Sequence, residues 1–180
     1  LMALLLLTFV RTDLLDRWRN ALPVDAPNRF IINVQPDQVD PVLAFLTAQG
    51  VAEPELFPMI RARLVDVNGQ AVDAGTLGEE GGRARRMAER EFNLSSAASL
   101  REDNQVTAGG FWTGRVPAET ELSVEEDFAA TLGWKLGDTV TFDIAGSPYT
   151  GRITSLRKID WESFRPNFFV IGSPGSLDAY

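Results

Sequence analysis

Two groups of carboxylates have the residue types and spacing closest to catalytic chemistry. Positions 125–127 are three consecutive acidic residues, and Asp160 and Glu162 stand on either side of Trp161. A carboxylate pair can supply the acid and base of glycoside hydrolysis, and an acidic cluster can bind a metal ion. Acidic residues in the first turn of a helix are also what the helix dipole favours. We therefore expect a structural role for 125–127, and we assign no catalytic residue to either group.

The amino-acid composition excludes several other site types. The chain has no cysteine and no histidine, which removes disulfides, thiolate nucleophiles, Cys/His zinc sites and the Ser-His-Asp triad. GSPGS at 172–176 matches neither GxxxxGK[ST] nor GxSxG, and Pro174 lacks the N–H that an anion cradle would use. We expect this segment to be a turn. The sequence predicts a protein that is not an enzyme and has no catalytic, metal-binding or cofactor-binding residues and no cofactor.

Charge argues against nucleic acid as a partner. The formal net charge is −8, whereas affinity for phosphate backbones comes mainly from Lys and Arg. The tract GGRARRMAER at 81–90 carries four arginines, but Glu89 and Glu91 offset their charge and no stacking aromatic residue accompanies them. We interpret the tract as the solvated face of a short helix.

The richest aromatic cluster lies near the C-terminus. Phe168 and Phe169 are expected to pack as core and wall. Trp161 and Phe164 lie on DWESFRPN, where the charges and Pro166 indicate surface. Core packing is the first interpretation of this cluster. The alternative is a hydrophobic partner or ligand surface, for which Trp161 and Phe164 are the candidates.

The N-terminus is an apolar run that ends abruptly. Nine of the first ten residues are apolar, and the basic residues follow the run instead of preceding it as in a signal peptide. The run is shorter than the roughly 20 residues that a bilayer requires. Leu14, Leu15 and Trp18 continue a helical stripe, with Trp18 where interfacial aromatics often occur. We interpret 1–20 as the end of a transmembrane helix and its stalk; an amphipathic helix packed on the core is the alternative.

The next segment reads as strand–helix–strand. ALPVDAPN at 21–28 is a proline-containing linker, and 30–34 is apolar and β-prone. The spacing of apolar residues predicts a helix within 36–50, ended by Gly50. A second strand within 55–67 leads to Asn68-Gly69, a strong hairpin signal. Both strands are apolar enough to be mostly buried.

In the rest of the chain, the spacing of the apolar residues changes several times along the sequence. Positions 74–91, which could include a short exposed helix, and 101–114 are expected to be loops, with a strand over 92–98 between them. Ser123 and Glu126 form a capping-box pattern that predicts a helix over 121–134, with Val124, Phe128 and Leu132 on one face. The later elements are a hairpin of strands over 139–144 and 150–159, a short buried strand over 167–172, and the start of a helix before residue 180.

Two stretches resemble the extracytoplasmic domain of FtsX-like (MacB-like) ABC transporter permeases. RTDLLDRWRNALPVDAPNRFIINVQPDQVDPVLAFL with FPMIRARLVDVNG resembles the membrane-exit stalk and the first strand–helix–strand of that domain. ELSVEEDFAATLGWKLGDTVTFDIAGSPYTGRITSLRKIDWESFRPNFFV is similar to its later part, with an acidic helix and an LGxxxGDxxxF turn into a hairpin. The likeness is greatest to the second periplasmic domain of the large duplicated permeases, and little of it extends to 70–120.

The resemblance implies an α+β fold made of two subdomains. A porter-like strand–helix–strand subdomain would comprise 28–67 plus 152–180 and be incomplete at its C-terminus. An inserted, more irregular β-rich subdomain with a small β-hairpin would comprise 68–151. The end of a transmembrane helix and its stalk, 1–20, would precede both.

The resemblance also implies a function in transport. The chain would be a non-catalytic periplasmic domain of an inner-membrane permease, held by flanking transmembrane helices. By mechanotransmission it would couple ATP hydrolysis by a cytoplasmic ABC ATPase to export or extraction of a hydrophobic or lipid-like substrate, or to a periplasmic partner protein. The alternatives are a soluble binding or scaffold domain and, third, a carboxylate-dependent hydrolase.

Overall fold

The computed structural model describes residues 30–180 except 53, 73–81, 83–89 and 164. The expected stalk with Leu14, Leu15 and Trp18 lies outside the described residues, as do the linker 21–28 and most of the arginine-rich tract. Of that tract, Gly82 and Arg90 are described.

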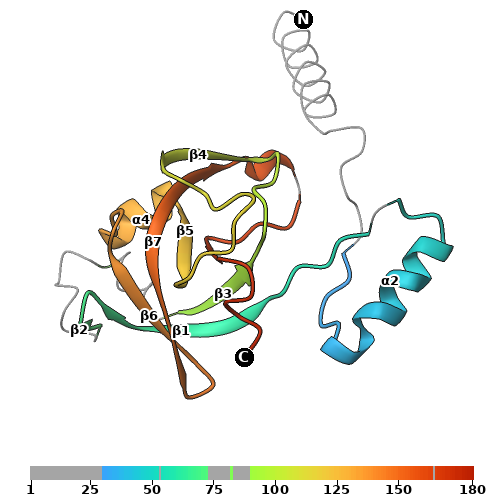
Figure 1. Ribbon diagram of the computed structural model, residues 1–180, viewed down its shortest axis with the longest axis horizontal. Helices are drawn as coiled ribbons and strands as arrows, with labels where there is room; N and C mark the ends of the chain where they lie inside the picture. Colours follow the sequence, from blue (N-terminus) through green and yellow to red (C-terminus); the bar gives the residue numbers. More distant parts are fainter. Residues whose placement is uncertain (1–29, 53, 73–81, 83–89, 164) are drawn as a thin grey trace, which may run out of the picture.

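Eight strands of the described chain form one sheet, and six of them close into a barrel (Figure 1). Around the barrel, β1 pairs with β3, then β8, β5, β7 and β6 follow in turn, and β6 pairs again with β1. The bounds are β1 Ile60–Val67, β3 Glu91–Ser96, β5 Glu121–Glu125, β6 Thr139–Ile144, β7 Ser147–Ile159 and β8 Val170–Gly172. Outside the barrel, β2 (Gln70–Ala71) extends β1 and β4 (Asn104–Gly109) lies along the second half of β7.

Alternation of apolar and polar residues builds the barrel core. In β6, Val140, Phe142 and Ile144 point inward and are buried, as their period of two predicts. Aromatic rings from other elements meet Phe142 edge to face, including Phe92 with a centroid separation of 5.4 Å. The predicted hairpin of β6 and β7 is therefore confirmed, with β7 beginning three residues earlier than expected.

The predicted turn at Asn68-Gly69 is also confirmed. Both residues have positive φ angles, 56° and 79°, as a two-residue hairpin between β1 and β2 requires. The Asn68 side chain then reaches the start of β6, where its Oδ1 accepts from the Thr139 backbone N–H at 2.8 Å and its Nδ2 donates to Asp138 at 2.9 Å. The turn residue thus joins two strands of the barrel.

The helix predicted to begin near Ser123 begins later. Residues up to Glu125 form β5, and the helix, α4, spans Glu126–Leu132. Ser123 is buried and donates to Ser155 Oγ at 3.0 Å, so it caps no helix and the capping-box prediction is wrong. Glu125 takes the capping role, because its Oε2 accepts from the Phe128 backbone N–H at 2.6 Å. The pairing of β5 with β7 and β8 places Ser123 in the middle of the sheet, and this pairing outweighs the local preference of Ser123 to cap a helix.

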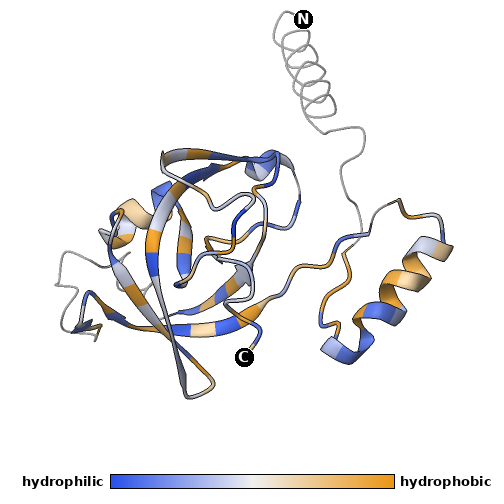
Figure 2. Ribbon diagram, in the orientation of Figure 1, coloured by the Kyte–Doolittle hydropathy of each residue, from blue (hydrophilic) through white to orange (hydrophobic). Residues whose placement is uncertain are grey.

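Residues 30–59 form an arm that extends away from the barrel (Figure 1). The predicted helix is confirmed as η1 (Pro36–Gln38) followed by α2 (Val39–Ala48), but no residue of α2 is buried. The predicted strand at 30–34 is wrong: these residues are not in a strand, and Ile32 is 72% exposed. A β-prone segment needs a neighbouring strand to pair with, and the described chain supplies none. Figure 2 shows the apolar residues that the arm carries along its length.

Two other expectations are corrected. The segment 101–114, expected to be a loop, contains β4. The final residues do not start a helix; they form successive turns, in which the Ser176, Asp178 and Tyr180 N–H groups each donate to the carbonyl three residues earlier. The expectation that 172–176 is a turn fits these bonds.

One mixed sheet with short helices is consistent with an α+β fold. Strands from 28–67, 68–151 and 152–180 hydrogen-bond within that sheet. The division of the chain into a porter-like and an inserted subdomain at these boundaries stays a prediction.

Candidate functional site

The segment 160–169 between β7 and β8, here called the Trp161 loop, carries the candidate surface. It contains η3 (Trp161–Ser163), and Trp161 is 49% exposed. Its ring lies 5.3 Å from that of Phe169, which is 43% exposed and stacks on Phe128 of α4 at 4.8 Å. Trp161 is therefore at the surface as expected, whereas Phe169 is more exposed than a core residue. Phe164 lies outside the described residues. We call Trp161 and Phe169 the aromatic patch.

A buried carboxylate holds the loop to the start of β4. Asp103 Oδ2 accepts hydrogen bonds from Ser163 Oγ at 2.9 Å and from Asn167 Nδ2 at 2.8 Å. Its Oδ1 accepts from Asn104 Nδ2 at 3.0 Å, and its backbone carbonyl accepts from the Asp160 N–H at 2.8 Å. Asp103 therefore contacts both ends of the segment that carries Trp161.

Arg101 extends this network to the arm. Its Nε lies 3.3 Å from Asp103 Oδ1, and its Nη1 donates to the Pro166 carbonyl at 2.6 Å. The guanidinium also stands over the ring of Phe57, 4.8 Å from the centroid. One arginine thus contacts the last residues of the arm, the Asp103 carboxylate and the Trp161 loop.

The hydrogen bonds to Asp103 also decide its protonation. Burial by itself would raise the pKa of this carboxyl, because it disfavours the charged form. Hydrogen bonds from Asn167, Ser163 and Asn104, together with the Arg101 charge, outweigh burial and hold the pKa of Asp103 below its ordinary value. The Asp103 carboxyl is therefore ionised at neutral pH.

A buried arginine supports the far end of the loop. Arg157 of β7 is fully buried, and its Nη2 donates to the Phe168 carbonyl (the next carbonyl, of Phe169, accepts from the Glu125 N–H at 2.8 Å). Burial lowers the pKa of Arg157 to about 10, opposed by the charges of Glu125 and Asp103. The residue is therefore a cation at neutral pH. Its Nε and Nη1 have no hydrogen-bond partner.

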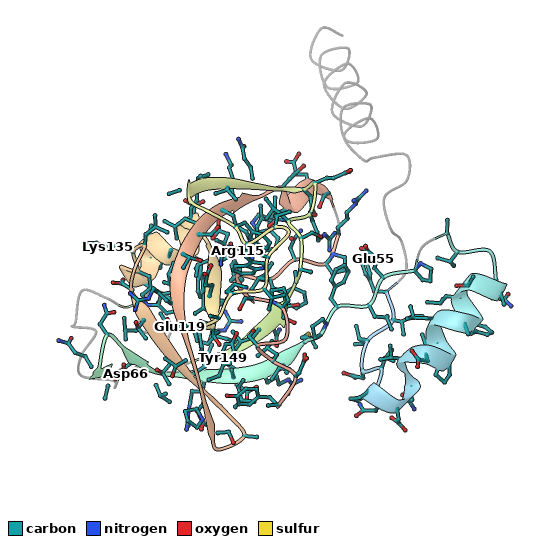
Figure 3. All side chains as sticks on the ribbon, viewed as in Figure 1. Glu55, Asp66, Arg115, Glu119, Lys135 and Tyr149 are labelled. Carbon is teal, nitrogen blue, oxygen red and sulfur yellow. The ribbon has the colours of Figure 1, made fainter. Side chains whose placement is uncertain are left out.

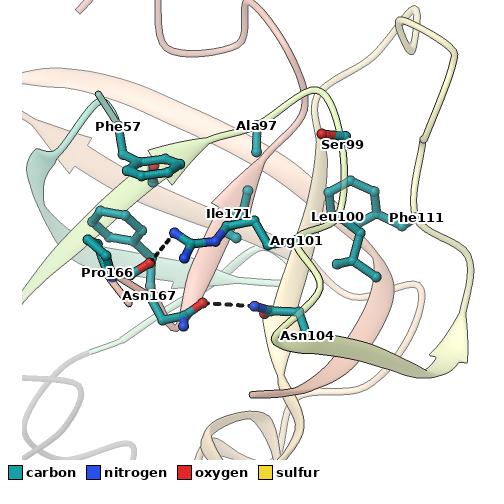
Figure 4. A pocket seen from close by; sticks show the side chains of 12 residues that line it. Phe57, Ala97, Ser99, Leu100, Arg101, Asn104, Phe111, Pro166, Asn167 and Ile171 are labelled. Atoms are coloured by element: carbon teal, nitrogen blue, oxygen red, sulfur yellow. Dashed lines mark hydrogen bonds between the residues drawn. The ribbon is translucent and has the colours of Figure 1, made fainter. Parts of the chain in front are cut away.

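A small cavity lies between the arm, the 95–101 segment and the loop (Figure 4). Its volume is about 20 Å³, enough for about one water molecule. The walls include Phe57, Leu100, Phe111 and Pro166, and Asn104, whose buried Oδ1 has no hydrogen-bond partner, also lines it. The cavity is too small for an organic ligand, so these residues serve chiefly as contacts between the arm and the loop.

The carboxylates do not assemble a reactive centre in the described residues. The pair Asp160 and Glu162 lies in a turn, where Asp160 Oδ1 accepts from the Glu162 backbone N–H at 3.0 Å. Glu125 is buried as the cap of α4, while Asp127 is exposed. In the part of the chain that the structure describes, no three acidic residues lie close enough to hold a metal ion.

Three residues of the site, Arg101, Asp103 and Arg157, were not predicted from the sequence. A signal existed for Arg157, because it stands at an inward position of β7, two residues from Ser155 and two from Ile159. A charged residue in the inward register of a strand requires a partner, and the loop carbonyls provide one. Nothing in the spacing of Arg101 and Asp103 predicted their contacts with residues about 60 positions away.

The comparisons with known proteins place these features in context. No family model matches the chain. The chain is 41% identical over 177 residues to the protein described as "Uncharacterized ABC transporter permease YbbP" of Escherichia coli (strain K12). The match covers 98% of this chain and 20% of the length of that relative. In the described residues, no helix is long and apolar enough to span a membrane. The chain is therefore similar, along nearly its whole length, to a segment of an ABC transporter permease.

Proposed function

We propose that the chain is a non-catalytic periplasmic domain of an ABC transporter permease. The observation that carries this proposal is the 41% identity over 98% of the chain to a protein named as such a permease. The FtsX-like (MacB-like) type, and the likeness to the second periplasmic domain of a duplicated permease, are supported by the LGxxxGDxxxF turn that leads into β6.

The proposed role is mechanical coupling across the inner membrane. A cytoplasmic ABC ATPase hydrolyses ATP, and flanking transmembrane helices pass the motion to the periplasm. In this proposal 1–20, with Leu14, Leu15 and Trp18, is the end of such a helix and its stalk. The motion drives export or extraction of a hydrophobic or lipid-like substrate, or acts on a periplasmic partner protein through a surface that includes Trp161 and Phe164.

The arm is the element proposed to receive the motion. Its apolar residues Phe30, Ile31, Ile32 and Phe45 are all more than half exposed, as expected for a surface that another part of a longer protein covers. The chain spans 20% of the length of its relative, so we assign the cover to the same polypeptide. The porter-like subdomain, 28–67 plus 152–180, and the inserted subdomain, 68–151, remain part of this proposal.

Contacts on the barrel offer a route from the arm to the Trp161 loop. Phe57 at the base of the arm packs under Arg101, which binds both Asp103 and the Pro166 carbonyl. A displacement of the arm would therefore act on charged hydrogen bonds, which are stronger than neutral ones. Coupling by this route requires a direct test, because contact alone does not establish it.

Membrane sidedness tests the proposal. Gln105 is exposed on β4, and this chain contributes no cysteine of its own. Gln105→Cys in an otherwise cysteine-free full-length protein should react with a membrane-impermeant maleimide in intact spheroplasts. Glu119→Cys, at a second exposed site, should behave identically. Reaction only after lysis would overturn the periplasmic placement and favour the soluble binding or scaffold domain.

A further inference from the structure

We propose that the aromatic patch docks a basic segment of a partner protein that also carries apolar side chains. This inference deepens the proposed function and rests on it, because it names the class of periplasmic partner. Trp161 and Phe169 supply the apolar contact. Asp160 and Glu162, both exposed and on either side of Trp161 in the chain, supply negative charge and are here called the acidic rim.

The aromatic rings are exposed yet held in place. Trp161 rests on Phe169, and Phe169 rests on Phe128, which is buried against Trp134 and Phe92 in the core. An aromatic column from the core to the surface offers a rigid apolar contact at little conformational cost on binding. Tryptophan is also the residue type that most often dominates the binding energy of a protein interface.

The support beneath the loop is a fully buried cation, Arg157. Its Nε and Nη1 have no hydrogen-bond partner among the described residues, while its Nη2 donates to the Phe168 carbonyl. Burying a charged donor without a full set of hydrogen-bond partners is unfavourable. Departures of this kind from ideal folding are expected where function requires them. The hydrogen bond from Arg157 to the Phe168 carbonyl fixes the position of the chain immediately before Phe169.

Charge identifies the partner as basic. Asp160 and Glu162 flank Trp161, and α4, which packs on Phe169 through Phe128, begins with the acidic residues Glu126 and Asp127. Arg165 of the same loop is not free, because it already has an interaction. A lysine or arginine of the partner can pair with this rim and lie over the Trp161 ring. The chain's net charge of −8 disfavours an anionic lipid surface as the alternative occupant.

A tryptophan-resolved titration tests the inference on the full chain. The probe is a synthetic peptide, KKLFKKLF, and the matched peptide is EELFEELF. In chain labelled with 5-fluorotryptophan, the lysine peptide should shift the ¹⁹F resonance that Trp161→Phe removes. The resonances of Trp112 and Trp134, which are buried, should stay in place. Raising the salt concentration from 50 to 500 mM should weaken binding several-fold, because exposed charges are screened.

Charge variants supply the control. Asp160→Asn with Glu162→Gln should weaken binding about fivefold, since exposed pairs contribute modestly. Glu55→Gln with Glu119→Gln removes the same charge at two exposed sites outside the Trp161 loop, one in the arm and one shortly before β5 (Figure 3). This control should bind like the parent.

Three outcomes would overturn the inference. The first is an equal Trp161 shift with the glutamate peptide, the second is no shift at all, and the third is a shift with phosphatidylglycerol vesicles but not with the lysine peptide. Each would leave the spheroplast labelling result unchanged, because that result depends on where Gln105 lies in the cell and not on the patch.

Discussion

At the residue scale, the Asp103 carboxylate holds the Trp161 loop by hydrogen bonds to two of its side chains. It accepts from Ser163 and Asn167 of the loop, and it pairs with Arg101. The Asp103 side chain is 5% exposed, so solvent cannot replace these hydrogen bonds if the charge is removed. Hydrogen bonds to a charged group are worth about 1.5–3 kcal/mol.

Asp103→Asn should therefore lower the free energy of unfolding by about 1.5–3 kcal/mol at pH 7. Because the pKa of Asp103 is depressed in the folded state, its contribution is present above the unfolded pKa of about 4 and is lost as pH falls through the folded value. The difference between parent and variant should shrink below pH 4. Urea unfolding at pH 7 and at several acidic pH values measures this difference.

Glu119→Gln, at an exposed position, is the matched control and should be near neutral at each pH. A difference between parent and Asp103→Asn that stays constant down to pH 2 would contradict the assignment of a charged network to Asp103.

At the element scale, the two hairpin turns and the helix of the arm were predicted correctly, whereas the closure of six strands into a barrel was not. The period-two pattern of β6 and the Asn68-Gly69 turn were read correctly, because pattern and turn chemistry agree with the final burial. Ser123 was misread because its burial in β5 depends on β7 and β8, which come later in the chain. The strand predicted at 30–34 was wrong for the opposite reason: the segment is β-prone, but no described strand pairs with it.

The candidate site was also predicted only in part. The surface position of Trp161 could be read from the charges and proline around it, whereas the support could not. Arg101 and Asp103 act on Pro166, Ser163 and Asn167, partners that only the closed sheet brings to them.

The C-terminal turns are predicted to depend on a glycine at the end of β8. A Cβ at Gly172 would overlap the Tyr149 hydroxyl and lie 2.6 Å from Ser176 Oγ. Tyr149 is buried and bonds to Ser176 at 2.9 Å, and burial raises the pKa of Tyr149 to about 12, so its hydroxyl stays neutral. Gly172→Ala should destabilise the fold by about 1–3 kcal/mol in urea unfolding.

Tyr149→Phe in the Gly172→Ala background should recover part of that loss, because it removes the overlapping oxygen. Gly110→Ala is the control, since a Cβ there meets nothing within 4 Å. Equal effects of the Gly110 and Gly172 changes would show that the close packing around Gly172 has no energetic consequence.

At the scale of the whole molecule, the barrel and the arm should be separable in stability. No residue of η1 or α2 is buried, whereas the barrel has a continuous apolar core. A chain that begins at residue 54, which retains Phe57, should keep a cooperative urea transition with a midpoint close to that of the full chain. The core residues Trp112 and Trp134 report the transition by fluorescence. Loss of the cooperative transition would show that the arm is part of the folding unit.

Coupling between membrane and barrel is the central claim, and a distance measurement in the full-length permease with its ATPase tests it most directly. Spin labels at Gln49→Cys, after α2, and Gln105→Cys, on β4, report the position of the arm relative to the barrel. In reconstituted membranes, pulsed electron-spin distances should change between the nucleotide-free state and the state trapped with ATP and vanadate. A matched pair on the barrel alone, Gln105→Cys with Glu119→Cys, should give one distance in both states. An arm-to-barrel distance distribution that is identical in both states would contradict the account.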